Sequence, residues 1–262
     1  MPLAAKLFEV APPEVRWLEI HPENYMGRGG RYRETLERAL DRWPIGTHGL
    51  TMCFGSVTPF EAHYLTALRT LLGEVQPPWH SDHLCFAGAD GVLLHDLLPL
   101  PYTREAVDVV VRRIREAQGA LGLPIAIENI SWYGQPGPSE MDETTFHLEV
   151  LEKADCKILL DVNNVYVNSR NHGGDPRAFI DAMPAERVVQ YHIAGHLVRG
   201  DGFIIDTHAE PICEDVYTLF EHTLRTIGPR PTLLERDDKF PTFEALHAEL
   251  RRLDAIWRGV FG

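Results

Sequence analysis

The sequence has few cysteines and no hydrophobic run long enough to cross a bilayer. Its four cysteines, Cys53, Cys85, Cys156 and Cys213, are far apart and form no Cys-x-x-Cys pair. This spacing argues against a disulfide framework and against a thiolate zinc site. A membrane-spanning helix needs about 20 consecutive apolar residues, and neither such a run nor a cationic-apolar leader is present. We therefore expect a soluble, cytoplasmic protein with reduced thiols and no membrane partner.

Positive charge is also scarce. Lysine and arginine total 25 against 38 aspartates and glutamates, which gives a formal net charge of -13 at pH 7. The basic residues form no cluster, and phosphate backbones are bound through lysine and arginine. Nucleic acid is therefore excluded as an expected partner.

What the sequence does contain is a regular alternation of apolar runs and amphipathic stretches, as in repeated β-α units. Strands are predicted at Val15–Ile20, Ile45–Leu50, Pro78–Phe86, Ile125–Ile130, Lys157–Val162, Val188–His192 and Thr232–Leu234. Helices are predicted at Tyr32–Trp43, Pro59–Val75, Arg104–Leu121, Glu143–Ala154, Pro176–Ala182, Glu214–Ile227 and Phe243–Trp257. Thr58-Pro59-Phe60-Glu61 is typical of a capping box, and Asp175-Pro176 of a helix start.

These units are joined without flexible linkers, which predicts one domain over residues 1–262. The fold class is α/β, a TIM (β/α)8-type barrel that lacks or replaces its first strand, because only seven strand-helix units can be counted.

Polar residues with metal-binding side chains stand at the ends of most of these strands. Carboxyl ends of barrel strands meet on one face, where a site draws residues from several strands. The loop "IIDTHAEP" adds Asp206 and His208, which face the same way if that segment is extended. The candidate ligands are His48, His83, Glu128, Asp161, His192, Asp206, His208 and Glu235.

The carboxylates in this set require a cationic partner. Glu128, Asp161 and Glu235 each follow an apolar run, and a buried unpaired carboxylate is costly. Arg236 would point away from Glu235 on a strand. Four histidines and four carboxylates without a thiolate favour iron, manganese or zinc, and eight ligands exceed the capacity of one ion with open positions. The pattern therefore predicts two or three metal ions.

Eight segments together resemble the multinuclear non-heme iron-dependent oxidative enzymes, the family of the methanobactin biosynthesis oxidase. They are "WLEIHPENY", "SDHLCF", "DLLPLPYT", "AIENIS", "LLDVNNVYVNSRNHG", "HIAGH", "DTHAEPI" and "LLERD". The resemblance implies a TIM barrel with two or three iron ions (Fe2+/Fe3+). It also implies an oxidoreductase that uses dioxygen to modify cysteines of a ribosomally synthesised precursor peptide. A small partner protein usually delivers the peptide in this family.

The resemblance also implies residue roles. The family's metal ligands fall on the same eight positions, of which Asp161, His192 and Glu235 are the candidate catalytic residues. Asn164 and His196 are expected to support the cofactor, His196 as a donor to a ligating carboxylate. Asn171 and His172 are the candidates for substrate contact. One departure is that relatives usually begin with a Gly-x-Gly-Leu-Arg strand, which this sequence lacks.

Three alternatives stay open at this point. A zinc phosphodiesterase of the endonuclease IV-like barrel type uses a similar ligand ring, but the acidic balance argues against it. A sugar isomerase of the xylose isomerase type would require mostly carboxylate ligands and a lysine near the site, and the four histidines of the ligand set argue against it. A non-enzymatic metal-storage or peptide-binding role is the third class.

Overall fold

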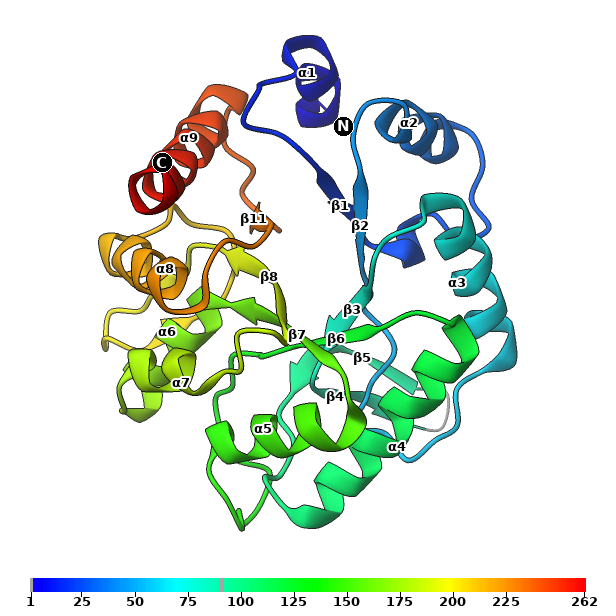
Figure 1. Cartoon of the computed structure of the whole chain (residues 1–262), viewed down its shortest axis with the longest axis vertical. Coiled ribbons are helices and arrows are strands. Elements are labelled where there is room, and N and C mark those ends of the chain that lie inside the picture. Colours follow the sequence, from blue (N-terminus) through cyan, green and yellow to red (C-terminus); the bar gives the residue numbers. More distant parts are fainter. Residues whose placement is uncertain (1, 90–91) are drawn as a thin grey trace. The chain divides into compact units, whose positions relative to one another are not determined.

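The computed structural model describes residues 2–89 and 92–262, and these divide into two units. One unit lies within residues 17–159, and the other comprises residues 2–16 and 160–262. Figure 1 shows the first unit in blue to green and most of the second in green to red.

The main sheet has seven strands in the order β1-β2-β3-β6-β7-β8-β11. Their bounds are β1 Leu18–Ile20, β2 Ile45–His48, β3 His80–His83, β6 Ile125–Glu128, β7 Lys157–Asp161, β8 Val188–Ile193 and β11 Thr232–Leu234. The pairs β1–β2, β2–β3, β3–β6, β6–β7 and β8–β11 are all parallel. This order, with helices between the strands, is that of a TIM-type barrel and confirms the predicted fold class. The described sheet has seven strands, one fewer than the usual eight, as the sequence predicted.

In residues 17–159, helices connect the parallel strands. They are the 3-10 helix η1 Pro22–Asn24 and the α-helices α2 Arg31–Leu40, α3 Ala62–Val75, α4 Arg104–Leu121 and α5 Glu143–Ala154. The bounds of α4 match the prediction because both ends of the helix carry capping residues. Thr103 accepts a hydrogen bond from the Ala106 amide at 3.2 Å, and Gly122 ends the helix in the left-handed conformation. The apolar face of α4, including Val107 and Ile114, is buried.

The predicted capping box at the start of α3 is wrong. The helix begins at Ala62, and its N-cap residue Glu61 makes no side-chain capping bond. The preceding segment is held elsewhere, because the Arg113 guanidinium donates to the Thr58 carbonyl and stacks 3.8 Å from the centre of the Phe60 ring. These contacts keep residues 58–60 out of the helix.

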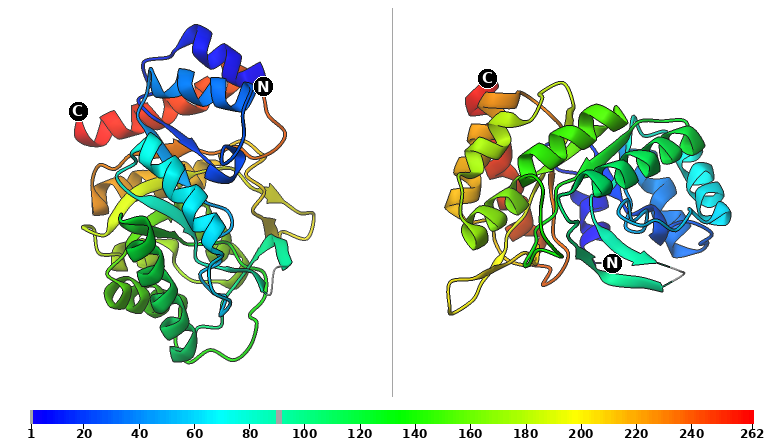
Figure 2. Two further views of the ribbon diagram at one scale, coloured as in Figure 1. Left: turned by 90° about the vertical axis from the view of Figure 1, so that its right-hand side faces the viewer. Right: turned by 90° about the horizontal axis from the view of Figure 1, so that it is seen from below.

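A β-hairpin replaces the end of the predicted strand Pro78–Phe86. The parallel strand ends at His83, and β4 Phe86–Ala89 then pairs antiparallel with β5 Val92–Leu98, which the sequence did not predict. Figure 2 shows this hairpin as a ribbon apart from the main sheet. Between β3 and β4 the backbone turns tightly, with the Cys85 amide donating to the His83 carbonyl at 3.0 Å, and Cys85 packs in a small core with Cys53 and Ile130.

Residues 1–16 and 160–262 carry the remaining elements. They are α1 Pro2–Val10, α6 Val162–His172, α7 Pro176–Ala182, β9 Leu197–Val198, β10 Ile204–Ile205, α8 Glu214–Ile227 and α9 Phe243–Phe261. The start of α7 confirms the prediction, since Asp175 accepts from the Arg177 amide at 2.9 Å with Pro176 in the first turn. Helices α1 and α6 were not predicted. The α6 segment is rich in asparagine and valine, which are poor helix formers, and its burial against β8 and α8 overrides that preference.

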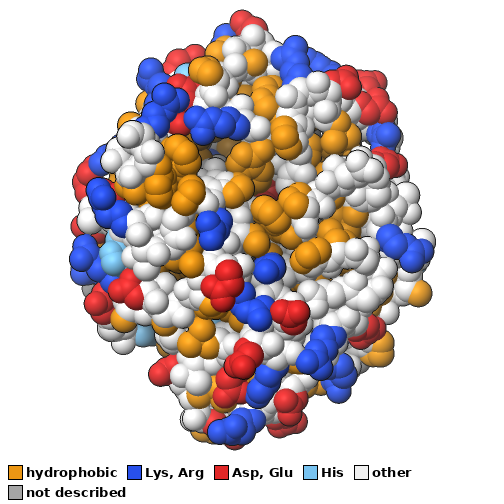
Figure 3. Space-filling model, in the orientation of Figure 1, with side chains coloured by type: hydrophobic (Ala, Val, Ile, Leu, Met, Phe, Trp, Pro, Cys, Tyr) orange, Lys and Arg blue, Asp and Glu red, His pale blue; other side chains and the backbone are white. Residues whose placement is uncertain are grey.

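No helix among the described residues combines the length and apolar character needed to span a membrane. Figure 3 shows acidic and basic side chains interspersed on the face in view.

Candidate metal centre

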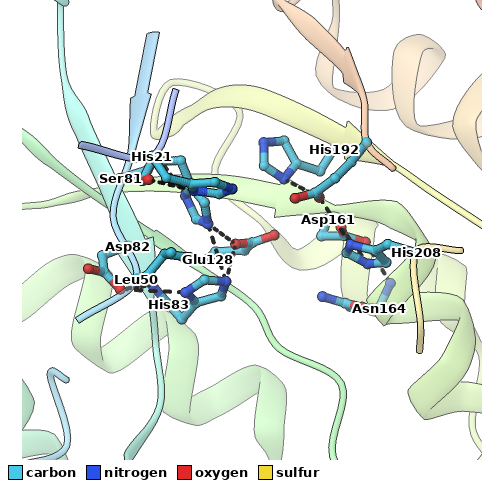
Figure 4. Close-up of polar contacts among 12 residues, drawn as sticks. His21, Leu50, Ser81, Asp82, His83, Glu128, Asp161, Asn164, His192 and His208 are labelled. Atoms are coloured by element: carbon cyan, nitrogen blue, oxygen red, sulfur yellow. Dashed lines mark hydrogen bonds and ion pairs between the residues drawn. The ribbon is translucent and has the colours of Figure 1, made fainter. Parts of the chain in front are cut away.

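The first cluster lies in residues 17–159, at the carboxyl ends of three parallel strands. His48 ends β2, His83 ends β3 and Glu128 ends β6. The Nε2 atoms of His48 and His83 are 3.2 Å apart, and the Glu128 Oε2 atom lies 3.0 and 3.3 Å from them, respectively. Figure 4 shows the side chains of His83 and Glu128 turned toward each other. His48 and Glu128 are almost fully buried.

The three distances suit a metal ion. Donor atoms about 2.1 Å from an ion stand about 3.0 Å apart along an octahedral edge and about 3.4 Å apart along a tetrahedral edge. The near-equilateral triangle of His48, His83 and Glu128 has edges in this range. Two imidazoles and one carboxylate on one face are also the donor set of mononuclear non-heme iron sites. This triad therefore fits an iron ion.

Neighbouring residues set the orientation of the triad. The Ser81 hydroxyl donates to the Thr47 carbonyl at 3.1 Å, so its oxygen accepts from His48 Nδ1 at 3.0 Å. This hydrogen bond orients the His48 ring, whose Nε2 faces His83 and Glu128. Asp82 lies beside His83, with 3.5 Å between Oδ1 and Nδ1, and accepts from the backbone amides of His83 and Met52. Burial opposes the charge of Asp82, but the side chains of His83 and His48 and the Met52 amide lower its pKa below the usual value.

The second cluster lies in residues 160–262. One donor atom each of Asp161, His192 and Glu235 lies within 4.8 Å of the other two. Asp161 ends β7, His192 stands in β8 and Glu235 follows β11. His192 Nδ1 is 2.9 Å from Glu235 Oε2, and its other ring nitrogen is 2.9 Å from the Gln190 amide. The predicted burial is confirmed, since Asp161 and His192 are fully buried and the Glu235 side chain is 11% exposed.

His208 extends this cluster. Its Nε2 is 2.8 Å from Asp206 Oδ1, and its Nδ1 is 3.2 Å from Glu235 Oε2 and 3.4 Å from Asp237 Oδ2. Neither His208 Nε2 nor Glu235 Oε2 has a partner among the described residues that meets hydrogen-bond geometry, although both atoms are buried. Such an arrangement is expected when lone pairs point to a common centre. Burial would lower the pKa of His208, but the carboxylates of Asp206 and Glu235 raise it well above its usual value.

The Asp206–His208 segment is not extended, so the condition under which the two side chains would face the same way along a strand is not met. β10 ends at Ile205, and His208 has a φ of 45°, in the left-handed region. The two side chains meet because the backbone turns there. The Asp237 amide donates to the His208 carbonyl at 3.0 Å and holds this turn against the segment after β11.

His196 is linked to the cluster through a residue that the sequence did not single out. His196 Nδ1 is 2.8 Å from Asn163 Oδ1, and Asn163 Nδ2 donates to Asp206 Oδ1 at 2.8 Å. The His196 ring also stacks on Tyr166, and burial lowers its pKa. His196 therefore reaches a candidate ligand through one intermediate side chain rather than directly.

Asn164 and the two predicted substrate residues lie on α6. The Asn164 backbone amide donates to Asp161 Oδ1 at 2.7 Å, which caps the helix and orients the carboxylate. The Asn171 side chain makes two hydrogen bonds to Ile204. Its Nδ2 donates to the Ile204 carbonyl at 2.8 Å, and its Oδ1 accepts from the Ile204 backbone amide at 2.9 Å, which positions β10. His172 is exposed at the last turn of α6. Their contact with substrate stays a prediction.

Three residues of the two clusters were missed by sequence reasoning. Asp237 joins His208 and Glu235 in a group of possible ligands, and it could have been noticed as a carboxylate two positions after Glu235. Ser81 and Asn163 carry no sequence signal, because their roles depend on neighbours far along the chain.

Solved structures with a similar fold include sugar epimerases and xylose isomerase-like proteins. A D-psicose 3-epimerase from Clostridium cellulolyticum H10, solved with D-tagatose, matches with a TM-score of 0.62 and 12% identity over 98% of this chain and 92% of that one. A xylose isomerase-like TIM barrel protein from Mycobacterium smegmatis, in complex with magnesium, matches with a TM-score of 0.56 and 13% identity over 97% and 89%. Together, the fold and the strand-end clusters define a TIM barrel with candidate metal-binding groups.

The family is given by the sequence match. Residues 2–258 match the model described as RiPP precursor modification enzyme MbnB/TglH/ChrH. The chain belongs to this family, which modifies ribosomally synthesised precursor peptides, and the predicted family is confirmed. A UPF0276 protein of Anaeromyxobacter sp. (strain Fw109-5) is 45% identical over 95% of this chain and 87% of its own length. A UPF0276 protein of Caulobacter vibrioides (strain NA1000 / CB15N) is 40% identical over 94% and 87%.

Proposed function

We propose that this protein is a multinuclear non-heme iron oxidase that uses dioxygen to modify cysteine residues of a precursor peptide. The observation that carries the proposal is the triad of His48, His83 and Glu128, whose donor atoms form a triangle with edges of 3.0 to 3.3 Å. The second cluster, built from Asp161, His192, His208 and Glu235, supports more than one ion.

The residues of each cluster would hold iron, and bound iron would supply electrons for the reduction of dioxygen. The chain's own contribution is to orient the ligands and exclude water. Ser81 holds the His48 ring through Nδ1, and the Asn164 backbone amide binds one Asp161 oxygen while the other lies 3.8 Å from His208 Nε2. Asp161, His192 and Glu235 remain the proposed catalytic residues.

The donor set disfavours a magnesium-dependent sugar isomerase. Magnesium prefers oxygen ligands, whereas two of the three donors in the first triad are imidazole nitrogens. Lys239, the lysine nearest to Glu235 in sequence, pairs with Glu210 instead. The family match supports a peptide substrate, and we propose a small partner protein that delivers it.

Metal content of matched variants tests the proposal. We expect two to three irons per chain, by plasma mass spectrometry, in protein expressed with added iron and purified without chelators. His48→Ala and His192→Ala should each lose about one iron, because each removes a ligand from a different cluster. His63→Ala is the control, since that side chain is 82% exposed and pairs only with Glu61. Full occupancy by zinc or manganese with iron absent would move the assignment to hydrolysis or isomerisation.

Oxygen consumption tests the reaction itself. Iron-loaded protein is mixed with synthetic cysteine-bearing peptides encoded by reading frames beside the gene, and the product is followed by mass spectrometry. We expect dioxygen uptake that depends on the peptide cysteine and is lost on its replacement by serine. Iron binding without any uptake would favour a storage or peptide-binding role.

A further inference from the structure

Arg113 is a buried cation that makes no ion pair with any described residue. Its residue is only 5% exposed, and its guanidinium hydrogen-bonds to backbone carbonyls rather than to a carboxylate of the described residues. It donates instead to two backbone carbonyls, from Nη1 to Thr58 and from Nη2 to Met52 at 2.8 Å. Its Nε has no hydrogen-bond partner. Three of the five N–H groups are therefore unused, and a buried charge in this state is costly.

The guanidinium lines a cavity of about 240 Å³ in residues 17–159. Phe60 stacks on one side of the guanidinium, and Met52, Pro59 and Val92 add apolar surface to the wall. Glu61 also borders the cavity, but its side chain is 63% exposed and pairs with His63 at 3.1 Å. The cavity thus combines an apolar wall with one unneutralised positive charge.

The cavity wall is tied to the first metal cluster. The Met52 amide donates to Asp82 Oδ2 at 3.0 Å, and Asp82 holds the backbone of the candidate ligand His83 at 2.7 Å. The Leu50 amide and the Thr51 hydroxyl both donate to Glu23 Oε1. These bonds fix the loop after β2. The part of the cavity wall that this loop forms therefore has a fixed position a few residues after the end of β2.

We propose that this cavity is a binding subsite for a carboxylate carried on an apolar segment of the peptide substrate. The carboxylate class follows from the guanidinium fork, which matches a planar carboxylate, and from the single charge to be neutralised. The apolar wall selects a neighbouring hydrophobic group. That the carboxylate comes from a peptide rests on the proposed function, and its source is an acidic side chain or the C-terminus.

Nuclear magnetic resonance of methionine methyl groups tests the subsite. The protein has five methionines, and Met52 is fully buried in the cavity wall. Hexanoate is titrated against the full chain, with the neutral isostere hexanamide as the comparison. We expect a saturable shift of the Met52 signal, with hexanoate binding at least tenfold more tightly than hexanamide. Equal binding of both, or no shift, would overturn the proposal.

Two variants and a control locate the charge. Arg113→Met should weaken hexanoate binding at least tenfold, whereas Arg112→Met, the exposed neighbour on α4, should leave it unchanged. Val92→Glu places a carboxylate at the 65% exposed border of the cavity and leaves the Arg113 backbone contacts intact. It should weaken hexanoate binding by a similar factor even if Arg113→Met does not fold. Unchanged hexanoate binding in Val92→Glu would count against the subsite.

Two capped peptides identify the source, and iron content separates this proposal from the previous one. Acetyl-Leu-Leu-Leu with a free C-terminus and acetyl-Leu-Glu-Leu-amide are titrated in the same way, and binding of neither would overturn the peptide assignment. All titrations are repeated on iron-free protein. Loss of carboxylate binding with normal iron content rejects only the subsite, and carboxylate binding by a protein that takes no iron rejects only the oxidase.

Discussion

At the scale of single residues, the candidate ligands depend on small neighbours that leave them room. A Cβ atom on Gly49 would stand 2.5 Å from Asp82 Oδ2 and 3.0 Å from His80 Nε2. Both side chains are buried, and Asp82 is fixed by the amides of Met52 and His83. The glycine directly after His48 is therefore required by close packing beside the first cluster.

Gly49→Ala is expected to lower the free energy of unfolding by roughly 1–3 kcal/mol, as for other overpacked sites. It should also lose about one iron per chain, because Asp82 must move and His83 with it. Urea unfolding and metal analysis measure both effects. Gly73→Ala is the control, since nothing lies within 4 Å of its Cβ position on α3 and alanine is the better helix former. A Gly49→Ala protein with normal stability and iron would contradict this account.

His147 predicts a pH dependence of stability away from the metal clusters. Burial lowers the pKa of His147 to about 4, while its Nδ1 bonds the Glu143 carbonyl at 2.8 Å. In the unfolded chain this histidine takes up a proton below a pKa of about 6.5. The unfolded state then binds more protons, so stability falls as pH drops from about 6.5 to 4, by roughly 3 kcal/mol in all. His147→Gln should flatten the dependence over this range, and His63→Gln should not. Equal slopes in urea midpoints for all three proteins would refute the prediction.

At the scale of elements, the side chain of Asp161 both caps helix α6 and belongs to the second candidate metal cluster. Asp161 ends β7, caps α6 through the Asn164 amide at 2.7 Å, and presents its second oxygen to His208. The helix has little intrinsic propensity, so its start depends on this cap and on burial of residues such as Val165.

Two substitutions separate these roles of Asp161. Asp161→Asn keeps a capping oxygen and should keep far-ultraviolet circular dichroism while iron content falls by about one per chain. Asp161→Ala should lose the iron and also about 1 kcal/mol of stability, the usual contribution of an N-cap. Equal stability of the two variants would show that the cap does not matter.

The elements also show where sequence reasoning is sufficient. The bounds of α4, α5, α7, α8 and β11 agree with the prediction, because each carries local caps or a short apolar run. The hairpin β4–β5 and helix α6 were missed, because their conformation depends on tertiary contacts that outweigh local propensity. The predicted start of α3 was wrong for the same reason, since the Arg113 guanidinium donates a hydrogen bond to the Thr58 carbonyl.

At the scale of the whole molecule, metal binding should stabilise the fold. The chain has a net charge of -13, and its clusters bury several carboxylates that a cation would neutralise. A ligand at about a hundred times its dissociation constant adds about 2.7 kcal/mol per site. Anaerobic addition of Fe2+ to stripped protein should raise the melting temperature in scanning calorimetry, and chelation should reverse it. Mg2+ should give a much smaller shift, and an equal shift with both ions would argue against imidazole-containing sites.

The sequence by itself determined the barrel class and placed the candidate ligands, by residue type, at the ends of predicted strands. It could do so because strand periodicity and apolar runs are local properties of the chain. Only the tertiary structure decided which residues act together. It grouped His48, His83 and Glu128 into one triangle, added Asp237 to His208 and Glu235, and placed Asn163 between His196 and Asp206. It also buried Arg113 without an ion pair to any carboxylate in the part of the chain that the structure describes. These groupings join residues far apart in sequence, so their distances are set by packing, which the sequence does not show directly.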